Sequence, residues 1–522
     1  MMTRPNWLPT NVPITMLNRI VTAAQMQALE ASLFAAGMPV AALMEKAAGR
    51  IVQWLGATLL ERNHATSIGI LAGPGHNGGD ALVVARELQL QGHAVLLYHP
   101  FERRKPLTES HYRYAQYLNI PEVSDFAALK DCQLLIDGLF GLGQTRAIAG
   151  DLAKTIDQIN QGSTTVVSID LPTGIESDTG AVLGTALRAT HTLCLGSWKR
   201  ACFQENAVEY LGQPHCLDFG LPEVAIATAL GDQPSQICLT PPAALAAIPL
   251  QRAPTTHKYH QGHLLLIGGS QRYGGSIVLA GLGARASGVG MLTIAVPESL
   301  KPLVLAQLPE ALVLACPETP EGAIAALPPE LELAKFNTVA CGPGLTTQTP
   351  KLLNQLWQTP TPLLLDADAL NLLAHQTDSL PPRDPPTLLT PHPGEFRRLF
   401  PDLEVGDRWA ALLQGAAQRQ AIILLKGAKT LIARPEGQVW AIANGTPALA
   451  RGGSGDVLTG LAGGWLAQTE PRQAAMTLAA AAWAHAAAAQ EIASTHTMLG
   501  VDPVRLAQAI DGAIAAAARS PA

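Results

Sequence analysis

Short apolar runs that end in glycine, each followed by a helical pattern, constrain the fold of this chain more than any other feature. In the first half, SIGILAG (67–73) leads into the helical stretch DALVVARELQLQGH (80–93) and then into a second apolar run, AVLLYHP (94–100). A strand, a helix and a parallel strand joined in this order form a right-handed crossover unit. Because the runs are continuously apolar, the sequence predicts a parallel sheet with helices on both faces.

The same pattern continues in both halves of the chain. The first half opens with a helical pattern over 22–55 and adds candidate strands at 133–141 and 165–174. The second half contains candidate strands at 263–269, 291–297, 337–344, 361–370, 386–395 and 421–427. Between the halves, residues 221–256 are rich in Pro, Ala and Thr and contain no clear strand, which is typical of a boundary. We predict an α/β fold with two doubly wound domains, 1–225 and 257–522, joined by a boundary region at 226–256.

Composition and charge exclude several classes of function. The net charge is −6, so no global positive field favours nucleic acid or an anionic membrane. The seven cysteines are scattered without a C-x-x-C pair, which argues against a disulfide framework or structural zinc and fits a reducing cytoplasm. The first residues lack the apolar core of a signal peptide. The alanine-dominated stretch 474–489 predicts a packed interior helix, since alanine is too weakly apolar for a membrane span.

The stretch NGTPALARGGSGDVLTG (444–460) places Gly452, Gly453, Gly455 and Asp456 before an apolar helical run. The first turn of a helix has unpaired N–H groups and a partial positive charge, and glycines let a phosphate approach them closely. A carboxylate there would repel phosphate unless it has another task, such as accepting a proton from a reacting hydroxyl. The loop therefore predicts an anion hole with Asp456 as base. The alternative is a glycine-rich turn capped by an aspartate, which is common.

Other motifs of the second half also follow predicted strands. KGAKT (426–430) follows one strand, DADAL (366–370) and TPHPGE (390–395) follow two others, and no GxxxxGK[ST] motif of a P-loop enzyme occurs. His392 has a structural turn histidine as its alternative reading. Arg451 is placed to screen phosphate charge, and a solvated surface arginine is the alternative.

Three acids of the first half, Asp80, Asp137 and Asp170, stand at the ends of predicted neighbouring strands. The carboxyl ends of parallel strands meet at one crevice, so we expect these acids to converge there. Buried unpaired carboxylates are costly, and a cation is therefore expected among them. The alternative is that Asp80 and Asp170 cap helices and Asp137 caps a turn.

Together, the motifs of the second half resemble those of the ribokinase-like sugar and vitamin kinases, and more closely those of the NAD(P)H-hydrate dehydratase family. The family's motifs occur here in the expected order: Gly-Gly-Ser (268–270), Gly-Pro-Gly (342–344), Asp-Ala-Asp-Ala-Leu (366–370), His-Pro-Gly-Glu (392–395), Lys-Gly-x-x-Thr (426–430), Asn-Gly (444–445) and Gly-Ser-Gly-Asp (453–456). One departure is Tyr259, where the family has glycine after the lysine that precedes the first strand.

This resemblance implies removal of water from NADHX or NADPHX, the hydrated forms of the reduced nicotinamide cofactors. ADP in bacteria, or ATP in eukaryotes, phosphorylates the added ring hydroxyl, and phosphate then leaves; Mg²⁺ is expected with the nucleotide. Asp456 is the implied base. The implied nucleotide-binding residues are Lys426, Gly427, Ala428, Lys429, Thr430, Gly452, Gly453, Ser454 and Gly455. The implied substrate-binding residues are Ser276, Gly344, His392 and Asp456.

Residues 15–220 resemble the NAD(P)H-hydrate epimerase family, a Rossmann-like fold that interconverts the R and S hydrates. The shared motifs are Asn-Gly-Gly-Asp (77–80), Asp-x-x-Phe-Gly-x-Gly (137–143) and Asp-x-Pro-Thr-Gly (170–174). The implied potassium ligands are Asn77, Asp137 and Thr173. The implied substrate-binding residues are His76, Asn77, Gly78, Gly79, Asp80, Gly141, Leu142, Gly143, Gln144, Thr145, Arg146, Ala147 and Asp170, with Asp170 also the proton-transfer group. His76 and Ala81 depart from the family's Asn and Gly.

The pairing of the two halves resembles the fused bifunctional NAD(P)H-hydrate repair enzymes of bacteria. The resemblance implies that the partners are the small-molecule substrates and that the protein is a homo-oligomer. Three alternatives remain open. One is a vitamin or sugar kinase with an appended nucleotide-binding domain, and another makes the first domain a non-catalytic binding module. The third is a nicotinamide-dependent oxidoreductase, which requires GxGxxG with an acid about 20 residues further on.

Overall fold

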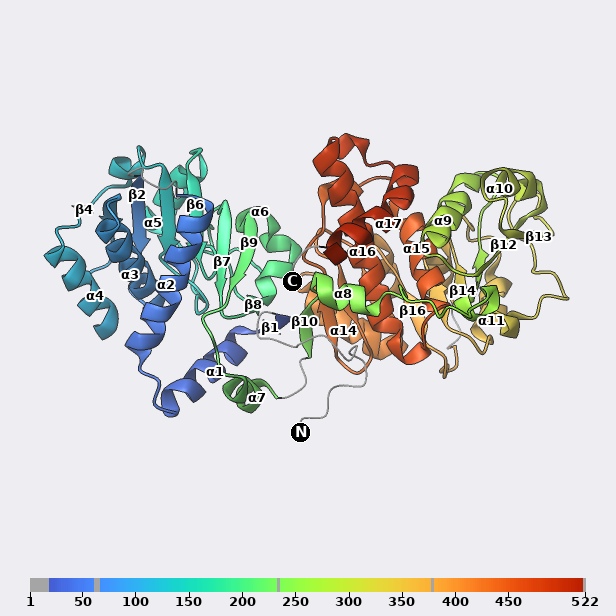
Figure 1. Ribbon diagram of the computed structural model, residues 1–522, viewed down its shortest axis with the longest axis horizontal. Coiled ribbons are helices and arrows are strands. Elements are labelled where there is room, and N and C mark those ends of the chain that lie inside the picture. Colours follow the sequence, from blue (N-terminus) through green and yellow to red (C-terminus); the bar gives the residue numbers. More distant parts are fainter. Residues whose placement is uncertain (1–17, 61–65, 232–234, 377–379, 520–522) are drawn as a thin grey trace. The chain divides into compact units, whose positions relative to one another are not determined.

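The computed structural model describes residues 18–60, 66–231, 235–376 and 380–519 (Figure 1). The first residues, which the sequence analysis finds unlike a signal peptide, lie largely outside these ranges. Contacts divide the chain into two compact units, an N-terminal unit (Ile14–Gln236) and a C-terminal unit that runs from Ile237 to Ala522. Each unit has its own sheet and its own hydrophobic core.

The N-terminal unit contains a sheet in the order β4-β3-β2-β5-β6-β7-β9, which is seven-stranded within the described residues. Its strands are β2 (Ser67–Ala72), β3 (Ala94–Tyr98), β4 (Glu122–Val123), β5 (Leu134–Gly138), β6 (Thr165–Ile169), β7 (His191–Leu195) and β9 (Gln213–Leu217). All neighbouring pairs are parallel, as the continuous apolar runs predict. The sequence analysis missed β7 and β9. A short parallel pair, β1 (Ile20–Val21) and β8 (Trp198–Lys199), lies apart from this sheet.

Helices cover both faces of this sheet, which confirms the doubly wound class. Successive residues of β2 divide between two cores, because Ile70 packs with one face and Leu71 with the other. The first core includes α1 (Ala23–Ala35), α2 (Val40–Thr58), α3 (His76–Leu90), α4 (Pro106–Tyr117) and α7 (Glu223–Leu230). The second includes α5 (Gly150–Asn160). A one-turn helix, α6 (Val208–Leu211), precedes β9.

The C-terminal unit contains a sheet in the order β10-β19-β18-β17-β16-β15-β14-β11-β12-β13, which is ten-stranded within the described ranges. The strands are β10 (Gln236–Cys238), β11 (His263–Ile267), β12 (Met291–Pro297), β13 (Leu312–Cys316), β14 (Thr338–Cys341), β15 (Leu363–Leu365), β16 (Thr387–Leu389), β17 (Ile422–Leu425), β18 (Leu431–Ala433) and β19 (Val439–Ala441). From β13 to β17 the pairs are parallel, whereas β17, β18 and β19 form an antiparallel meander. The sequence analysis missed β13, β18 and β19.

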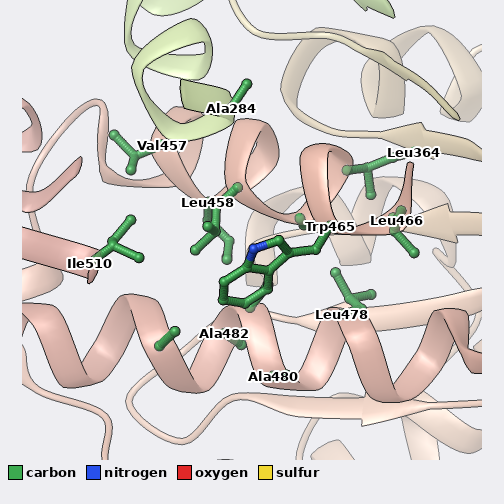
Figure 2. Packing of buried hydrophobic residues seen from close by; sticks show 14 of the residues in the cluster. Ala284, Leu364, Val457, Leu458, Trp465, Leu466, Leu478, Ala480, Ala482 and Ile510 are labelled. Atoms are coloured by element: carbon green, nitrogen blue, oxygen red, sulfur yellow. The ribbon is translucent and has the colours of Figure 1, made fainter. Parts of the chain in front are cut away.

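Six helices share one core with this sheet. They are α8 (Pro241–Ala247), α9 (Gly274–Ala286), α10 (Lys301–Gln307), α15 (Ser454–Leu466), α16 (Ala474–Thr495) and α17 (Pro503–Arg519). The remaining helices of the unit are α11 (Pro350–Trp357), α12 (Ala367–Ala374), α13 (Pro393–Leu399) and α14 (Arg408–Arg419). In Figure 2 the indole of Trp465 extends from α15 toward Ala480 and Ala482 of α16. The stretch 474–489 is thus a packed interior helix, and no described helix has the length and hydropathy to span a membrane.

Several expected boundaries are wrong. The region 221–256, in which no clear strand was expected, contains the strand β10, which pairs with β19, as well as helices α7 and α8. The strand expected over 361–370 ends at Leu365, because Asp366 is already the N-cap of α12. The strand expected over 386–395 ends at Leu389, and His392 caps α13.

Two helices begin earlier than their glycines suggest. Helix α3 begins at His76 rather than at Asp80, and α15 begins at Ser454 rather than after Asp456. A Cβ at Gly78 would lie 1.9 Å from the carbonyl oxygen of Gly73. The first turn of α3 therefore packs against the end of β2 so closely that tertiary contact outweighs the poor helix propensity of glycine.

Helices α9 and α15 touch through their backbones at two glycines. A Cβ at Gly460 would lie 1.7 Å from the oxygen of Ala280, and one at Gly283 would lie 2.1 Å from the oxygen of Val457. We expect Gly460→Ala to lower the free energy of unfolding by roughly 3 kcal/mol, since two backbones must separate. Gly275→Ala on α9, where no atom lies within 4 Å of the added Cβ, should cause no loss. Hydrogen exchange of α9 and α15 measures both, and an unchanged Gly460→Ala protein would contradict the contact.

Candidate functional sites

The N-terminal unit holds a cavity of about 510 Å³ at the carboxyl ends of its central strands. The predicted residues that line it are His76, Asn77, Asp80, Gly141, Leu142, Gly143, Gln144 and Asp170. The cavity is also lined by Glu30 from α1, by Lys105 before α4 and by Lys199 of β8, none of which the sequence analysis proposed. Gly78 and Gly79 are buried within α3, and Thr145, Arg146 and Ala147 do not line the cavity.

A buried ion pair lies at the wall of this cavity. Lys199 Nζ is 2.5 Å from Asp170 Oδ1, and the lysine side chain is only 1% exposed. The ammonium also donates to the carbonyl oxygens of Leu195 and Ser197 at 2.7 and 3.1 Å. Burial is the largest single influence and would lower the pKa of Lys199, but the charge and hydrogen bond of Asp170, together with Cys194 and Cys216, outweigh it, and the pKa is raised. The ammonium thus remains charged and offsets the buried carboxylate, a task that the sequence analysis assigned to a bound cation.

The carboxylate of Asp170 is held from several sides. Besides Lys199, it accepts hydrogen bonds from the backbone N–H groups of Leu195 and Leu142, both at 3.2 Å. Its own backbone has φ = 68°, in the left-handed region that non-glycine residues rarely adopt. A strained backbone conformation of this kind persists only where the surrounding structure holds it, and such residues are concentrated at functional sites.

Asp137 does not line the cavity, because other residues enclose it completely. Its Oδ1 accepts from the hydroxyl of Thr173 at 2.6 Å, and its Oδ2 accepts from the hydroxyl of Ser168 at 2.8 Å. Thr173 Oγ1 in turn accepts from the N–H of Phe140. Burial raises the pKa of Asp137, and these hydrogen bonds oppose that rise. The three acids therefore do not converge as expected, since two of them face the cavity and Asp137 lies behind them.

The potassium ligands that the resemblance implies nevertheless lie around one loop. Thr173 is bonded to Asp137, and a Cβ at Gly141 would lie 3.1 Å from Asn77 Oδ1. Asn77 Nδ2 is buried and has no hydrogen-bond partner among the described residues. An amide, a carboxylate and a hydroxyl offer the oxygen ligands of a hard cation. The oxygen donor set therefore fits a hard cation, with Asn77 contributing through Oδ1 and not through its unpartnered Nδ2.

Two carboxyl groups in the cavity have no hydrogen-bond partner in the described part of the chain. Glu30 lies on α1 and Asp80 on α3, and both are partly buried. Burial, followed by the charge of Asp170, raises the pKa of Glu30 and raises that of Asp80 well above its ordinary value. Burial and the nearby Lys105 lower the pKa of His76. Both carboxyl groups are thus biased toward their neutral forms.

The candidate site of the C-terminal unit surrounds the first turn of α15. Gly453 is its N-cap with φ = 93°, a left-handed conformation that favours glycine, and Asp456 lies in the first turn. Burial and the charge of Asp366 raise the pKa of Asp456 to about 7, against a hydrogen bond from Ser276. A carboxyl group that titrates near neutral pH suits general-base catalysis.

Lys426 lies against that first turn. Its Nζ is 2.5 Å from Asp366 Oδ1, and a Cβ at Gly455 would lie 3.4 Å from the same Nζ. Asp366 Oδ2 accepts a hydrogen bond from the hydroxyl of Thr459 at 2.5 Å. Asp366 thus fixes the ammonium beside the anion hole. The sequence analysis noted Asp366 only within the DADAL motif and missed Thr459, which lies one turn into α15.

The predicted nucleotide-binding loop 426–430 joins β17 to β18. Arg408 of α14 donates to the carbonyl oxygens of Lys426 and Lys429, both at 3.0 Å, so both sides of the loop are held by one guanidinium. Lys429 Nζ donates to the oxygen of Ala443 at 3.1 Å, and a Cβ at Gly445 would lie 2.3 Å from the oxygen of Ala428. The loop is therefore built against the segment that leads to Gly452.

The predicted substrate residues divide into two groups. A Cβ at Gly344 would lie 3.1 Å from the Cβ of Ser276, and Ser276 bonds to Asp456, so these three lie together. His392 has a clear structural part: it is the N-cap of α13, and its Nδ1 accepts from the N–H of Gly394 at 2.9 Å. Lys426 and Asp366 are near enough to affect its pKa, which burial lowers, so His392 also faces this site.

Arg451 does not point at the anion hole, contrary to one of the two expectations for it. Its guanidinium donates to the carbonyl oxygens of Leu499 and Val501. Instead His485, buried on α16, bonds through Nε2 to the oxygen of Ser454 at 2.9 Å. Burial lowers the pKa of His485 to about 4, so the neutral ring donates to this carbonyl. Nothing in the alanine-rich sequence around His485 indicates this contact.

Comparison with known proteins covers both units. Residues 264–511 match the family described as NAD(P)H-hydrate dehydratase, and residues 40–201 match the family described as YjeF-related protein N-terminus. A bifunctional NAD(P)H-hydrate repair enzyme Nnr from Thermosynechococcus vestitus is 53% identical over 489 residues, which cover 93% of this chain and 95% of that protein. The proteins of the same name from Synechocystis and Gloeobacter violaceus are 53% and 48% identical, and each alignment covers 94% of this chain and 93% or 96% of the relative.

A solved structure of an ADP/ATP-dependent NAD(P)H-hydrate dehydratase from Bacillus subtilis, co-crystallized with ATP and Mg²⁺, is 32% identical with a TM-score of 0.47, and it covers 54% of this chain and 98% of that chain. The bifunctional relatives span both candidate sites, whereas the Bacillus subtilis structure covers only about half of this chain. The chain belongs to the family of bifunctional NAD(P)H-hydrate repair enzymes.

Proposed function

We propose that this chain repairs hydrated nicotinamide cofactors with two active sites, one in each unit. The N-terminal unit interconverts the R and S epimers of NADHX and NADPHX, and the C-terminal unit dehydrates the S epimer to NADH or NADPH at the expense of ADP or ATP. The observation that carries the proposal is that a relative named for this repair is 53% identical over a length that spans both sites.

In the C-terminal unit, Asp456 takes the proton of the ring hydroxyl as that oxygen attacks the terminal phosphoryl group. The N–H groups at the start of α15 and the ammonium of Lys426 stabilise the negative charge of the phosphoryl group. The loop 426–430 holds the nucleotide, and Ser276, Gly344 and His392 contact the hydrated dinucleotide. Phosphate is a good leaving group, and the lone pair of the ring nitrogen expels it. Loss of a proton from the adjacent ring carbon then restores the ring double bond, and AMP or ADP and free phosphate remain.

In the N-terminal unit, the cavity holds the hydrated ring, and Asp170 is the proton-transfer group. The loops 76–80 and 141–147 bind the rest of the dinucleotide. Asn77, Asp137 and Thr173 would hold a potassium ion, which would supply fixed positive charge beside a dinucleotide phosphate. The fit of this oxygen donor set to a hard cation supports this assignment.

Magnesium is proposed only as a companion of the nucleotide. Among the described residues, no group of three or more His, Cys, Asp or Glu side chains is placed to hold a metal ion. Mg²⁺ commonly takes one or two protein carboxylates and completes its shell with water and phosphate oxygens. We therefore propose that nucleotide phosphates supply most of its ligands here.

The proposal is tested with a defined mixture of R and S NADHX, by following the absorbance of reduced nicotinamide with ADP, with ATP, or with no nucleotide, in K⁺ or Na⁺ buffer. We expect nucleotide-dependent recovery of NADH from both epimers, with free phosphate released in equal amount. Recovery that stops at the S fraction would leave the N-terminal unit as a binding module. A stable phosphorylated product would instead indicate a kinase, which the shared anion hole and base make the second candidate.

A further inference from the structure

The epimerase cavity contains more proton-carrying groups than Asp170, and each has a different hydrogen-bond environment. This inference rests on the function proposed for the N-terminal unit. An epimerisation through the hydrated carbon needs one group that gives a proton and one that takes a proton. The groups that line the cavity are Glu30, His76, Asp80, Lys105, Asp170 and Lys199.

Asp170 and Lys199 are unsuited to the donor role. The carboxylate of Asp170 is surrounded by hydrogen-bond donors, one ammonium and two backbone N–H groups, and this geometry suits a proton acceptor rather than a proton donor. All three protons of the Lys199 ammonium are already engaged, with Asp170, Leu195 and Ser197. The donor therefore comes from another element.

Glu30 has the opposite environment. Its carboxyl group has no hydrogen-bond partner in the described ranges, and it lines both the main cavity and a smaller apolar chamber of about 80 Å³. It lies in the middle of α1, away from either helix end, so no helix dipole favours its charged form. A carboxyl group without hydrogen-bond partners in the described ranges, beside one that is held by an ammonium and two N–H groups, is the arrangement expected of an acid and a base.

We propose that Glu30 is the proton donor of the epimerase site and that Asp170, held by Lys199, is the proton acceptor. The reduced nicotinamide ring is an enamine, so hydration places the hydroxyl on the carbon bonded to the ring nitrogen. Glu30 protonates that hydroxyl, the C–O bond breaks, and the nitrogen lone pair forms a C=N bond as water leaves. Water adds to the other face of the carbon, Asp170 takes its proton, and the electron pair returns to nitrogen. The proton lost by Glu30 equals the proton gained by Asp170, and exchange with solvent resets both.

The first test is the rate of interconversion of purified epimers without nucleotide, followed by chromatography. Glu30→Gln should lose about 100-fold or more in kcat, because general acid catalysis contributes about 10²–10⁴-fold. Glu30→Asp should retain part of the rate, since it keeps a carboxyl group. Glu223→Gln, the same change at an exposed position of α7, is the matched control and should match the wild-type protein. Hydrogen exchange of the N-terminal unit in each variant shows whether this unit remains folded.

The second test is the pH profile, which a merely structural glutamate would not determine. Wild-type interconversion should fall as pH rises through the ionisation of Glu30, and this limb should disappear in Glu30→Gln. Glu30 faces His76 and Asp80 of α3, Lys105, Asp170 and Lys199. Asp80 is the other carboxyl group of the cavity without a hydrogen-bond partner in the described ranges, so Asp80→Asn shows whether the fall in rate with pH belongs to Glu30 or to Asp80. Reaction in H₂¹⁸O should place ¹⁸O in the hydroxyl at the rate of interconversion.

The outcomes separate this inference from the proposed function. A wild-type protein that does not interconvert the epimers would contradict the function of the whole unit. A wild-type protein that does so, with Glu30→Gln within about 3-fold of it, would overturn the role of Glu30. Loss in Asp80→Asn alone would make Asp80 the donor, and interconversion without ¹⁸O uptake would overturn the C–O cleavage step.

Discussion

Asp456→Asn is expected to lower kcat of nucleotide-dependent dehydration by about 10²–10⁴-fold, because asparagine cannot accept the hydroxyl proton. The same protein should interconvert the epimers at the wild-type rate, since the other site lies in a separate unit. The measurement is the initial rate of NADH formation from purified S-NADHX at saturating ADP. A loss below about 10-fold would mean that Asp456 is not the base.

The pH dependence of that reaction gives an independent check. Burial and Asp366 raise the pKa of Asp456 to about 7, and a base acts only when it is ionised. The kcat should therefore rise with pH up to about 7 and then level off. Ser276 lowers this pKa through its hydrogen bond, so Ser276→Ala should move the limb to higher pH. A limb that stays in place would show that the titrating group is not Asp456.

Lys199→Met is expected to be the most damaging change to the stability of the N-terminal unit. It leaves the carboxylate of Asp170 buried without its counterion, and breaking a buried pair in this way costs about 3–5 kcal/mol. Asp170→Asn combined with Lys199→Met removes both charges and should recover most of that loss. Hydrogen exchange of the segments around β6 and β7 measures the effect locally.

The exposed pair Lys154 and Asp151 supplies the matched control. Its atoms are 2.8 Å apart, but the side chains are 74% and 95% exposed. Water screens such a pair, so Lys154→Met should leave hydrogen exchange unchanged. A Lys199→Met protein that behaves like Lys154→Met would mean that the buried pair does not stabilise the unit. A double variant as unstable as Lys199→Met would attribute the loss to packing rather than to charge.

The sequence predicts the architecture because its central strands are long and continuously apolar. Strands β2, β5, β11 and β12 begin within one residue of the positions that their runs indicate. The missed strands β18 and β19 have only three residues each, which is too short for a pattern to stand out. The early helix starts at His76 and Ser454 were missed because glycine reads as a turn, whereas contacts with distant backbone decide the conformation.

The sequence predicts those residues of the candidate sites that belong to a recognisable motif. Gly-Gly-Ser-Gly-Asp and the loop 426–430 do lie together, and the motif alone places Asp456 in the first turn of α15. Glu30, Lys199 and His485 carry no motif. Folding alone brings Glu30 of α1 to the cavity, Lys199 to Asp170, and His485 to the carbonyl oxygen of Ser454. Asp366 and Lys426 are separated by 60 positions in the sequence yet form one ion pair.

The glycine contact between α9 and α15 has a consequence for how variation in this family should be read. Ser276 lies at the start of α9 and Asp456 at the start of α15, so the approach of the two backbones sets the hydrogen bond between them. Gly283 and Gly460 lie in the interior of these helices and touch no reactant. In a mutational scan scored by activity, we expect both positions to tolerate as few substitutions as Asp456, the proposed base. Such a scan would find an active site larger than the set of residues that contact the substrate.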